Sequence, residues 1–513
     1  MHPLPASCRL ASKEECNTEV CNAGRVDLRE SQMLDASLLG SLIADPPFWL
    51  GQPAAARFIV DSLAAAHREL TLFAGFWLLV GLIDDLMIDL LWLAMVAAGQ
   101  LRAQRLPPGL TGCELSAPIA VFIPAWQEAA VIGTTLRHAL AAWPQQGLRL
   151  YVGYYGNDPA TSAAVVKAAD GDPRVRAIQV RSRGPTTKAD CLNRLYCQLV
   201  EDEARSGVPV RAVVLHDAED MVHAAELVVF DQALVHAEFV QLPVRAEPLA
   251  SSAWIAGHYV DEFAEAHTKS LVVRDALRAA LPAAGVGCAI GRELLDRLAV
   301  ERGGGAGSEP FAPDCLTEDY EIGWRIADLG ARARFLRLRA DDGQLIATRA
   351  HFPDTLEAAV RQKTRWTHGI AYQAWDRLGW SGRLVDRWMA LRDRRAPMAA
   401  AVLLAAYLSL VCGLLLQGCG GSSVASPQWL KPFALSCAAG LAWRLSLRTV
   451  FTAHDRGWAE GVRALIRAPV ANLIAIVSAH RALRAYLRVL RGAPLVWDKT
   501  AHCHHPAAGA APR

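Results

Sequence analysis

Three acidic side chains follow a short apolar run, and together they could hold a metal ion. The run is Val213-Val214-Leu215, and the acids are Asp217, Glu219 and Asp220. Such a run fits a strand buried on both faces, and ligands of α/β sheets bind beyond the carboxyl ends of strands. Three carboxylates repel each other unless a cation joins them, and hard oxygen ligands favour Mg²⁺ or Mn²⁺, which suit a diphosphate. The alternative is a solvated acidic turn.

The elements that would position these acids alternate between strands and helices. Strands are expected at 119–124, 149–155, 175–180, 213–215 and 239–243, and helices at 129–142, at 160–169 and from 188 onward. This order predicts a parallel, doubly wound sheet. The loops after its strands would bring Glu128, Asp158 and Lys188 to the same crevice as the acids. No Gly-x-Gly-x-x-Gly and no P-loop lysine occurs, which counts against a dinucleotide oxidoreductase and a P-loop NTPase.

Three further motifs follow the acids. Residues 285–292 are small and broken by glycines, which suits close approach of the backbone to a ligand. Thr317-Glu318-Asp319 places a candidate N-cap threonine before an acidic helix start, although helix-dipole complementarity alone could explain these acids. Residues 361–369 (RQKTRWTHG) combine basic side chains with an aromatic one. The alternative for this last stretch is an ordinary amphipathic helix.

The chain is apolar enough to contain membrane helices. Hydrophobic residues make up 52% of the 513, and the mean hydropathy is +0.17. Residues 70–98 are long enough to span a bilayer as one helix, yet Asp84, Asp85 and Asp89 lie within them, where charge is costly. Either these acids face other protein or a polar channel, or this helix lies partly in the membrane interface.

Residues 398–450 predict a transmembrane hairpin. Two apolar stretches, 398–416 and 430–450, are joined by an uncharged loop and flanked by arginines. The positive-inside rule places the arginine-rich ends, and the domain before them, in the cytoplasm. The apolar stretch 468–479 is too short to span. The segment 458–500 is therefore expected to contain an amphipathic helix on the cytoplasmic face, with a third, tilted span as the alternative.

The remaining composition excludes several classes of function. A net charge of +2 gives no argument for nucleic acid. The 12 cysteines include no C-x-x-C pair, so most are expected to be reduced, buried thiols. The start lacks a signal peptide, and residues 1–69 indicate no function. His502-Cys503-His504-His505 could bind metal, but a frayed tail over 501–513 is expected.

Taken in order, the motifs resemble those of the family 2 glycosyltransferases, and most closely those of membrane-bound, processive members such as bacterial cellulose synthase. The matching stretches are Ile123-Pro124-Ala125-Trp126-Gln127-Glu128, Lys188-Ala189-Asp190-Cys191-Leu192-Asn193, Asp217-Ala218-Glu219-Asp220, Thr317-Glu318-Asp319 and Gln362-Lys363-Thr364-Arg365-Trp366. Within that family, the acidic stretch 84–89 and Pro494-Leu495-Val496-Trp497-Asp498-Lys499-Thr500 resemble the bacteriophage N4 adsorption protein B group. The resemblance covers about 70–500 and implies a GT-A domain at 117–390.

This resemblance implies a nucleotide-sugar site. The donor would be a UDP-sugar, with Glu128 and Asp158 at the uridine and Lys188 near the nucleotide. Asp217, with Glu219 or Asp220, would hold Mg²⁺ or Mn²⁺. The chain departs from the family in having Asp-Ala-Glu-Asp instead of a plain Asp-x-Asp, so the second ligand stays open. It departs again in Gly156-Asn157-Asp158-Pro159, where Asp158 stands without the usual second aspartate.

The resemblance also implies a catalytic set and an acceptor site. Asp319 is the candidate general base, with Glu318 and Asp217 beside it, and nearby arginines are expected to lower its pKa. Gln362, Arg365 and Trp366 match the family's acceptor and diphosphate motif. One base without a covalent nucleophile suggests a single displacement with inversion.

The expected protein is a multi-pass enzyme of the bacterial inner membrane, with its catalytic domain in the cytoplasm. It would transfer a hexose or N-acetylhexosamine to a saccharide acceptor in exopolysaccharide synthesis. Periplasmic or outer-membrane export subunits are expected partners if the product is an exported polymer. Some relatives carry a further regulatory domain, and none is expected here. A catalytically silent scaffold for phage adsorption and a metal-dependent phosphoesterase are the alternatives. The intact acidic and Gln-x-x-Arg-Trp motifs argue against the first, and the scarcity of adjacent histidines against the second.

Overall fold

The computed structural model describes residues 53–101, 104–303, 308–418, 430–495 and 505–509. They divide into two compact units. One holds the described parts of Met1–Arg68 and Val411–Val424, and the other those of Glu69–Leu410 and Ala425–Arg513. The sheet and all the acidic motifs belong to the second unit. Several sequence-based expectations lie outside the described residues: those on 1–52, on the loop 419–429, on 496–500 and on His502-Cys503-His504.

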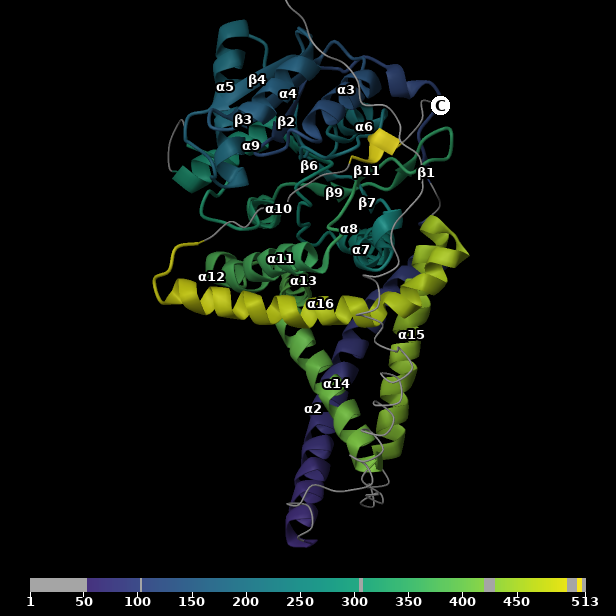
Figure 1. Ribbon diagram of the computed structural model, residues 1–513. Helices are drawn as coiled ribbons and strands as arrows, with labels where there is room; N and C mark the ends of the chain where they lie inside the picture. The colour runs from purple at the N-terminus through teal and green to yellow at the C-terminus, as the bar shows by residue number, and fades with distance from the viewer. Residues whose placement is uncertain (1–52, 102–103, 304–307, 419–429, 496–504, 510–513) are drawn as a thin grey trace, which may run out of the picture. The chain divides into compact units, whose positions relative to one another are not determined.

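A seven-stranded sheet forms the centre of the second unit (Figure 1), with the strand order β4-β3-β2-β5-β8-β6-β9. Its strands are β2 (Ile119–Pro124), β3 (Leu148–Tyr155), β4 (Val175–Val180), β5 (Ala212–Leu215), β6 (Phe239–Gln241), β8 (Cys288–Gly291) and β9 (Ala333–Phe335). Within this sheet, β8 runs antiparallel to β5 and β6, and the other neighbours are parallel. The expected α/β class with a doubly wound, mostly parallel sheet is confirmed.

Alternate side chains of the central strands enter two separate apolar layers, because successive side chains of a strand point to opposite faces. Val121 of β2 packs in one layer with the helices α3 (Ile132–Ala142), α4 (Pro159–Ala169) and α6 (Glu226–Ala233). Phe122 packs in the other layer with α5 (Lys188–Ser206), α9 (Arg292–Gly303) and α10 (Glu318–Asp328). Both side chains are fully buried. Burial on both faces explains the continuous apolar runs from which the strands were predicted.

The glycine-broken stretch 285–292, expected to allow close approach of the backbone to a ligand, is partly a strand. Its second half is β8, whose side chains Cys288, Ala289 and Ile290 are fully buried in the middle of the sheet. A strand of four residues beside two glycines has no readable periodicity. Its antiparallel insertion also breaks the regular alternation of strands and helices on which the prediction depended.

Several long helices follow the sheet. Among the described residues, α14 (Ala396–Gly418) and α16 (Trp458–Leu490) are long and apolar enough to cross a membrane. The stretch 468–479, expected to be too short to span, belongs to the 33-residue helix α16. In the second unit α16 packs along α7 (Ile255–Glu265), α11 (Leu356–Thr367) and α15 (Leu430–Arg456) (Figure 1).

The acids Asp84, Asp85 and Asp89 of helix α2 (Pro53–Ala97) face other parts of the protein. Asp84 and Asp85 pair with arginines at the end of α13 (Leu384–Arg394) and on α15: Arg392, Arg395 and Arg444. Asp89 lies 2.6 Å from Lys269 Nζ and accepts a hydrogen bond from Trp443. Of the alternatives left open by the sequence, the structure shows the first, in which these acids contact other parts of the protein. Pairing offsets much of the cost of burying these charges.

Helix α16 is joined to α7 by a buried ion pair. Arg467 is 1% exposed, and its Nη2 and Nε lie 2.7 and 2.9 Å from the two carboxylate oxygens of Asp261 on α7. The helices approach closely because Gly257 of α7 faces Arg467, whose Nη1 lies only 2.5 Å from where a Cβ would stand.

Arg467→Ala is expected to lower the free energy of unfolding by about 3–5 kcal/mol, because it leaves the buried Asp261 carboxylate without its partner. Thermal unfolding in detergent would measure the loss. Arg463→Ala is the matched control, since Arg463 also pairs with Glu460 on α16 but is 56% exposed, and it should change stability by less than about 1 kcal/mol. Equal effects of the two variants would contradict the assigned role of the buried pair.

Candidate active site

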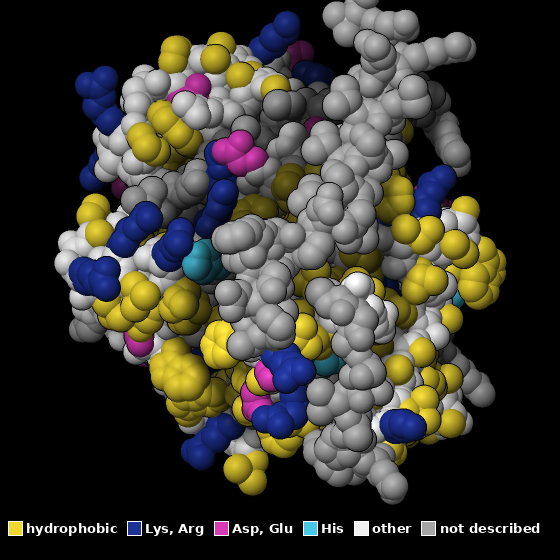
Figure 2. Space-filling view, turned by 60° about the horizontal axis from the view of Figure 1, so that its bottom comes forward, with side chains coloured by type: hydrophobic (Ala, Val, Ile, Leu, Met, Phe, Trp, Pro, Cys, Tyr) yellow, Lys and Arg dark blue, Asp and Glu magenta, His cyan; other side chains and the backbone are white. Residues whose placement is uncertain are grey.

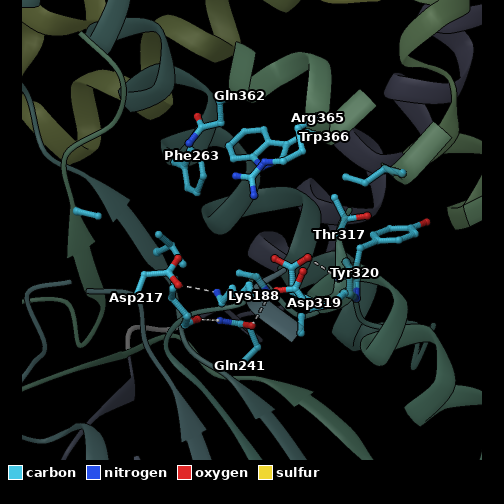
Figure 3. A pocket seen from close by; sticks show the side chains of 18 of the residues that line it. Lys188, Asp217, Gln241, Phe263, Thr317, Asp319, Tyr320, Gln362, Arg365 and Trp366 are labelled. Carbon is cyan, nitrogen blue, oxygen red and sulfur yellow. Dashed lines mark hydrogen bonds and ion pairs between the residues drawn. The ribbon is translucent and has the colours of Figure 1, made fainter. Parts of the chain in front are cut away.

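One cavity of about 580 Å³ lies at the carboxyl ends of the strands and collects side chains from distant parts of the chain. Of the twelve residues that the sequence singles out for the site, eleven line it: Glu128, Lys188, Asp217, Glu219, Asp220, Glu318, Asp319, Gln362, Arg365, Trp366 and the N-cap candidate Thr317. Asp158 does not. Figure 3 shows Asp217, Lys188 and Asp319 on one side of this space and Gln362, Arg365 and Trp366 on the other.

Lys188 lies between the two acidic motifs. Its Nζ is 2.6 Å from Asp217 Oδ1 and donates to the backbone carbonyl of Gly285 at 3.2 Å. Burial would lower the pKa of Lys188, but the carboxylates of Asp217, Glu318 and Asp319 outweigh burial and raise it. Lys188 is therefore a fixed positive charge where the two motifs meet.

The local sequence explains why Lys188 stands there. It is the first residue of α5, and Thr187 and Asp190 form a capping box at this helix start. Asp190 accepts hydrogen bonds from both the backbone N–H and the hydroxyl of Thr187 at 3.0 Å. The Lys-Ala-Asp motif thus contains one residue in the cavity and one that holds the helix end in place.

The side chain of Asp220 is engaged inside its own loop. Its Oδ2 accepts from Nδ1 of His216 at 3.0 Å and from the backbone N–H of Asp217 at 2.9 Å. His216 Nε2 in turn lies 2.7 Å from Glu226. Burial would lower the pKa of His216, but the two carboxylates raise it to about 10, so the ring is charged and donates from both nitrogens. These contacts favour Glu219 over Asp220 as the partner of Asp217.

Asp158 caps a helix outside the cavity. Its Oδ1 accepts from the N–H of Thr161 at the start of α4, and its Oδ2 accepts from the N–H of Gln127 at 2.5 Å. The hydroxyl of Thr161 accepts from the N–H of Glu128 at 2.9 Å. Asp158 therefore holds the turn after β2 that carries Glu128 into the cavity. Gln127 takes the left-handed conformation there, with φ 53°, which is uncommon for a residue other than glycine.

Glu318 is buried and Asp319 is partly buried at the start of α10. Burial raises the pKa of Asp319, although Lys188 and Arg365 act in the opposite direction. Arg365 thus acts in the direction that was expected of nearby arginines, but burial outweighs it and the pKa of Asp319 is raised overall. Burial, followed by the charge of Asp319, raises the pKa of Glu318 to about 7.

Gly285 makes room for Asp319. It has φ +75°, and a Cβ there would lie 2.6 Å from Asp319 Oδ2. Thr317 occupies the N-cap position of α10, but its side chain does not cap the helix as expected. Its hydroxyl is instead buried against Gly369, where a Cβ would lie 2.4 Å from Thr317 Oγ1. This contact places the Thr-Glu-Asp motif beside the turn that follows α11.

Gln362, Arg365 and Trp366 share α11, which Thr355 caps through its hydroxyl. The oxygen Oε1 of Gln362 is buried without a hydrogen-bond partner in the described part of the chain. Trp366 meets Tyr259 edge to face at 6.1 Å. The guanidinium of Arg365 extends from α11 toward Lys188 and Asp319 in Figure 3.

Sequence reasoning missed two buried residues that shape the site, His216 and Gln241. Gln241 is fully buried on β6; its Nε2 donates to the carbonyls of Val286 and Gly287, and its Oε1 accepts from the N–H of Ala284. It thereby holds the glycine loop beside Asp319. A polar residue inside the apolar run 239–242 was the available signal, because buried polar groups need partners.

The donor set suits a divalent cation. Asp217 and Glu219 present hard carboxylate oxygens to the cavity, as Mg²⁺ and Mn²⁺ prefer. Among the described residues, no three His, Cys, Asp or Glu side chains lie close enough to hold a metal by themselves. Two carboxylates fit an ion whose remaining ligands come from a phosphate group and water.

Three comparisons identify related proteins. Residues 117–369 match the model of the family described as glycosyltransferase like family 2. The chain is 30% identical over 454 residues to bacteriophage adsorption protein B of Escherichia coli strain K12, and equally to bacteriophage N4 adsorption protein B of Escherichia coli O157:H7. These alignments cover 82% of this chain and 60% of each relative, so the chain spans about 60% of the length of the curated relatives that it matches.

Among solved structures, the chain is similar to the mannosyltransferase PcManGT from Pyrobaculum calidifontis in complex with GDP-Man and Mn²⁺. The identity is 19% and the TM-score 0.43, with 81% of this chain and 98% of that chain covered. The family match coincides with the region that contains the sheet, the acids and the Gln-x-x-Arg-Trp motif. The match to the family described as glycosyltransferase like family 2 covers residues 117–369, just under half of the chain.

Proposed function

We propose that the protein transfers a hexose or N-acetylhexosamine from a UDP-sugar to a saccharide acceptor at the bacterial inner membrane, with inversion, in exopolysaccharide synthesis. One observation carries the proposal. A single cavity joins Asp217, Lys188 and Asp319 to Gln362, Arg365 and Trp366, which lie up to 178 residues away in sequence. Acidic, basic and aromatic groups thereby surround one space that can hold a nucleotide sugar and its acceptor.

The donor would lie along the carboxyl ends of β2 and β5. Glu128, positioned through Asp158 and Thr161, would bind the uridine, and Lys188 would supply positive charge near the phosphates. Asp217 and Glu219 would hold Mg²⁺ or Mn²⁺, which when bound neutralises the diphosphate and stabilises the departing UDP. Lys188 now pairs with Asp217, so it is already in place to contact the same phosphates.

Asp319 would act as the general base and accept the proton of the attacking acceptor hydroxyl. Glu318 would contribute negative charge beside it and Arg365 a phosphate contact. Gln362 would offer its unpaired oxygen to an acceptor hydroxyl, and Trp366 would stack on the acceptor sugar. Since the proposed set contains one base and no covalent nucleophile, the reaction is a single displacement and inverts the anomeric carbon.

The catalytic domain would stand on the cytoplasmic side of a membrane crossed by residues 70–98 and by a hairpin over 398–450. Helix α16 would lie on the inner surface. Its buried face is mostly small residues such as Ala464 and Ala471, with Arg467 and Ile474 among them, while Leu473 and Leu483 are exposed together with Arg481. Figure 2, which brings the lower side of Figure 1 forward, shows exposed hydrophobic side chains with Lys and Arg side chains among them. Export subunits are expected if the product is a secreted polymer.

The test uses the full chain purified in detergent. Incubation with Mn²⁺ or Mg²⁺ and a panel of UDP-sugars should release UDP with one donor well above the others, and chelation should stop the release. GDP-sugars serve as the control for the nucleotide base of the donor. UDP release that persists unchanged after chelation would contradict the proposed metal dependence.

The rate of transfer should fall on the acid side of about pH 7. The pKa of Glu318 is raised to about 7. Glu318 and Asp319 must both be ionised before Asp319, the proposed general base, can accept a proton. Glu318→Gln removes the like charge, so the remaining carboxyl ionises more easily and the acid limb moves down by about one pH unit. Profiles of kcat/KM against pH would show the shift. The exposed Glu293→Gln is the control, and an unmoved limb in Glu318→Gln would place the titrating group elsewhere.

A second candidate is a catalytically silent scaffold for phage adsorption, and the names of the two Escherichia coli relatives favour it. A scaffold would need the fold but not Asp217 or Asp319. If the wild-type protein releases no UDP from any donor, and phage adsorption to cells persists with Asp319→Asn, this candidate replaces the enzyme.

A further inference from the structure

The acidic loop, residues 216–223, is held from outside by side-chain hydrogen bonds to its backbone carbonyls. Three of these contacts come from α3 and its C-cap residue Trp143, which pack against the same layer of the sheet. They are Thr135 Oγ1 to Ala218 O at 2.5 Å, His138 Nε2 to Val222 O at 2.9 Å and Trp143 Nε1 to His223 O at 3.1 Å. The loop that carries Asp217 and Glu219 is thus fixed by contacts made on the side of α3.

A fourth contact comes from close to the C-terminal end of the chain. His505 Nε2 lies 3.2 Å from the carbonyl oxygen of Asp220, and His505 is 5% exposed. The expectation of a frayed tail is therefore wrong for His505. The 3₁₀ turn η6 (Pro506–Gly509) that follows packs against α3, so the helix that supplies three contacts also supports the fourth.

The tautomer of His505 is set by its neighbours. Its Nδ1 accepts from the backbone N–H of Ala507 at 3.0 Å, so the ring proton is on Nε2, which donates to Asp220. Burial lowers the pKa of His505 to about 4, which agrees with a neutral ring. The contact is therefore a directed hydrogen bond and not an ion pair.

Asp220 is the point at which this bond can act on the site. Its carboxylate accepts from the N–H of Asp217 and from His216, while its carbonyl accepts from His505. The residue is 1% exposed, so without His505 the carbonyl would be a buried acceptor lacking that partner. A shift of Asp220 would move Asp217, to which its carboxylate is bonded.

We propose that His505 is a positioning residue, which through Asp220 sets the placement of the Asp217 and Glu219 carboxylates. It lies well beyond the region matched by the family model, which ends at residue 369. The inference rests on the proposed function, since it assigns the acidic loop to the metal and the diphosphate. Replacing a residue that orients the metal ligands without binding the metal itself commonly changes metal affinity by about 10–100-fold.

The experiment uses the full-length protein in detergent, with His505→Ala, with His505→Gln, which keeps an N–H donor, and with His236→Ala as the exposed control. Hydrogen exchange is measured without metal or sugar. The peptide covering 212–225 should exchange about tenfold faster in His505→Ala, with a smaller change in His505→Gln and none in His236→Ala. Unchanged exchange in His505→Ala overturns the proposal, as does faster exchange across the whole domain.

The second measurement is the Mn²⁺ concentration that gives half-maximal UDP release. It should rise about tenfold in His505→Ala, with a smaller change in kcat, and His505→Gln should restore much of it. An unchanged Mn²⁺ requirement overturns the proposal. If the wild-type protein releases no UDP from any donor while His505→Ala still loosens the peptide 212–225, the proposed function fails and the positioning role of His505 stands.

Discussion

Asp319→Asn is expected to slow sugar transfer by about 10³-fold while the protein still binds the UDP-sugar. The amide keeps the size of the side chain and can still accept the N–H of Tyr320, which the carboxylate accepts at 2.7 Å. It cannot take the proton of an acceptor hydroxyl. The substitution leaves Glu128, Lys188 and Asp217 in place, and these are the cavity residues proposed to bind the nucleotide and its diphosphate.

The measurement is turnover with saturating donor, together with calorimetric binding of the UDP-sugar. Asp328→Asn on the same helix is the matched control, because Asp328 is exposed at its far end. Loss of donor binding in Asp319→Asn would make Asp319 a structural residue or a nucleotide ligand. Retention of the full rate would mean that the base is another group, of which Glu318 is the nearest in sequence.

The sequence predicts the parallel part of the sheet well because each of those strands is short, apolar and followed by a polar loop. The expected strands at 119–124, 149–155 and 175–180 match β2, β3 and β4 to within one residue. The strand at 213–215 lacks only its first residue, Ala212. Burial on both faces leaves this pattern in the residues themselves.

The antiparallel strand β8 could not be predicted in this way. Its pairing with β5 spans more than 70 residues and its pairing with β6 about 50, and its small residues resemble a loop. The length of helix α16 was underestimated for a related reason. Arginines interrupt its apolar stretch, yet one of them, Arg467, is buried in an ion pair with α7, which only the tertiary structure provides.

In the site, the motifs identify the residues that line the cavity but not what each of them contacts. Asp158 and Asp220 have the residue type of a ligand, and both accept backbone N–H groups that hold neighbouring site residues. His505 lies in a stretch that was expected to be a frayed tail, yet it is buried. Such roles depend on which donors the fold brings within about 3 Å, and the distance along the chain does not reveal this.

Asp217→Asn is expected to reduce metal-dependent UDP release by about 10³-fold, and raising Mn²⁺ should not restore it. The side chain of Asp217 is 35% exposed and pairs with Lys188. Its replacement removes a hard anionic ligand and this ion pair, while the charges of Glu318 and Asp319 still act on Lys188. Glu219→Gln should lose less activity and recover with excess Mn²⁺, as a second ligand would.

Asp220→Asn tests whether Asp220 binds the metal or instead supports the loop that carries Asp217. Because Asp220 is bonded to His216 and to the Asp217 N–H, its replacement should lower the melting temperature and leave the Mn²⁺ requirement of the folded fraction nearer to that of the wild-type protein than Asp217→Asn does. Activity measured against Mn²⁺ concentration for the three variants, alongside thermal unfolding, gives both quantities. If Asp220→Asn loses the metal response while Glu219→Gln keeps it, the second metal ligand is Asp220, and the contacts with His216 must break when the ion binds.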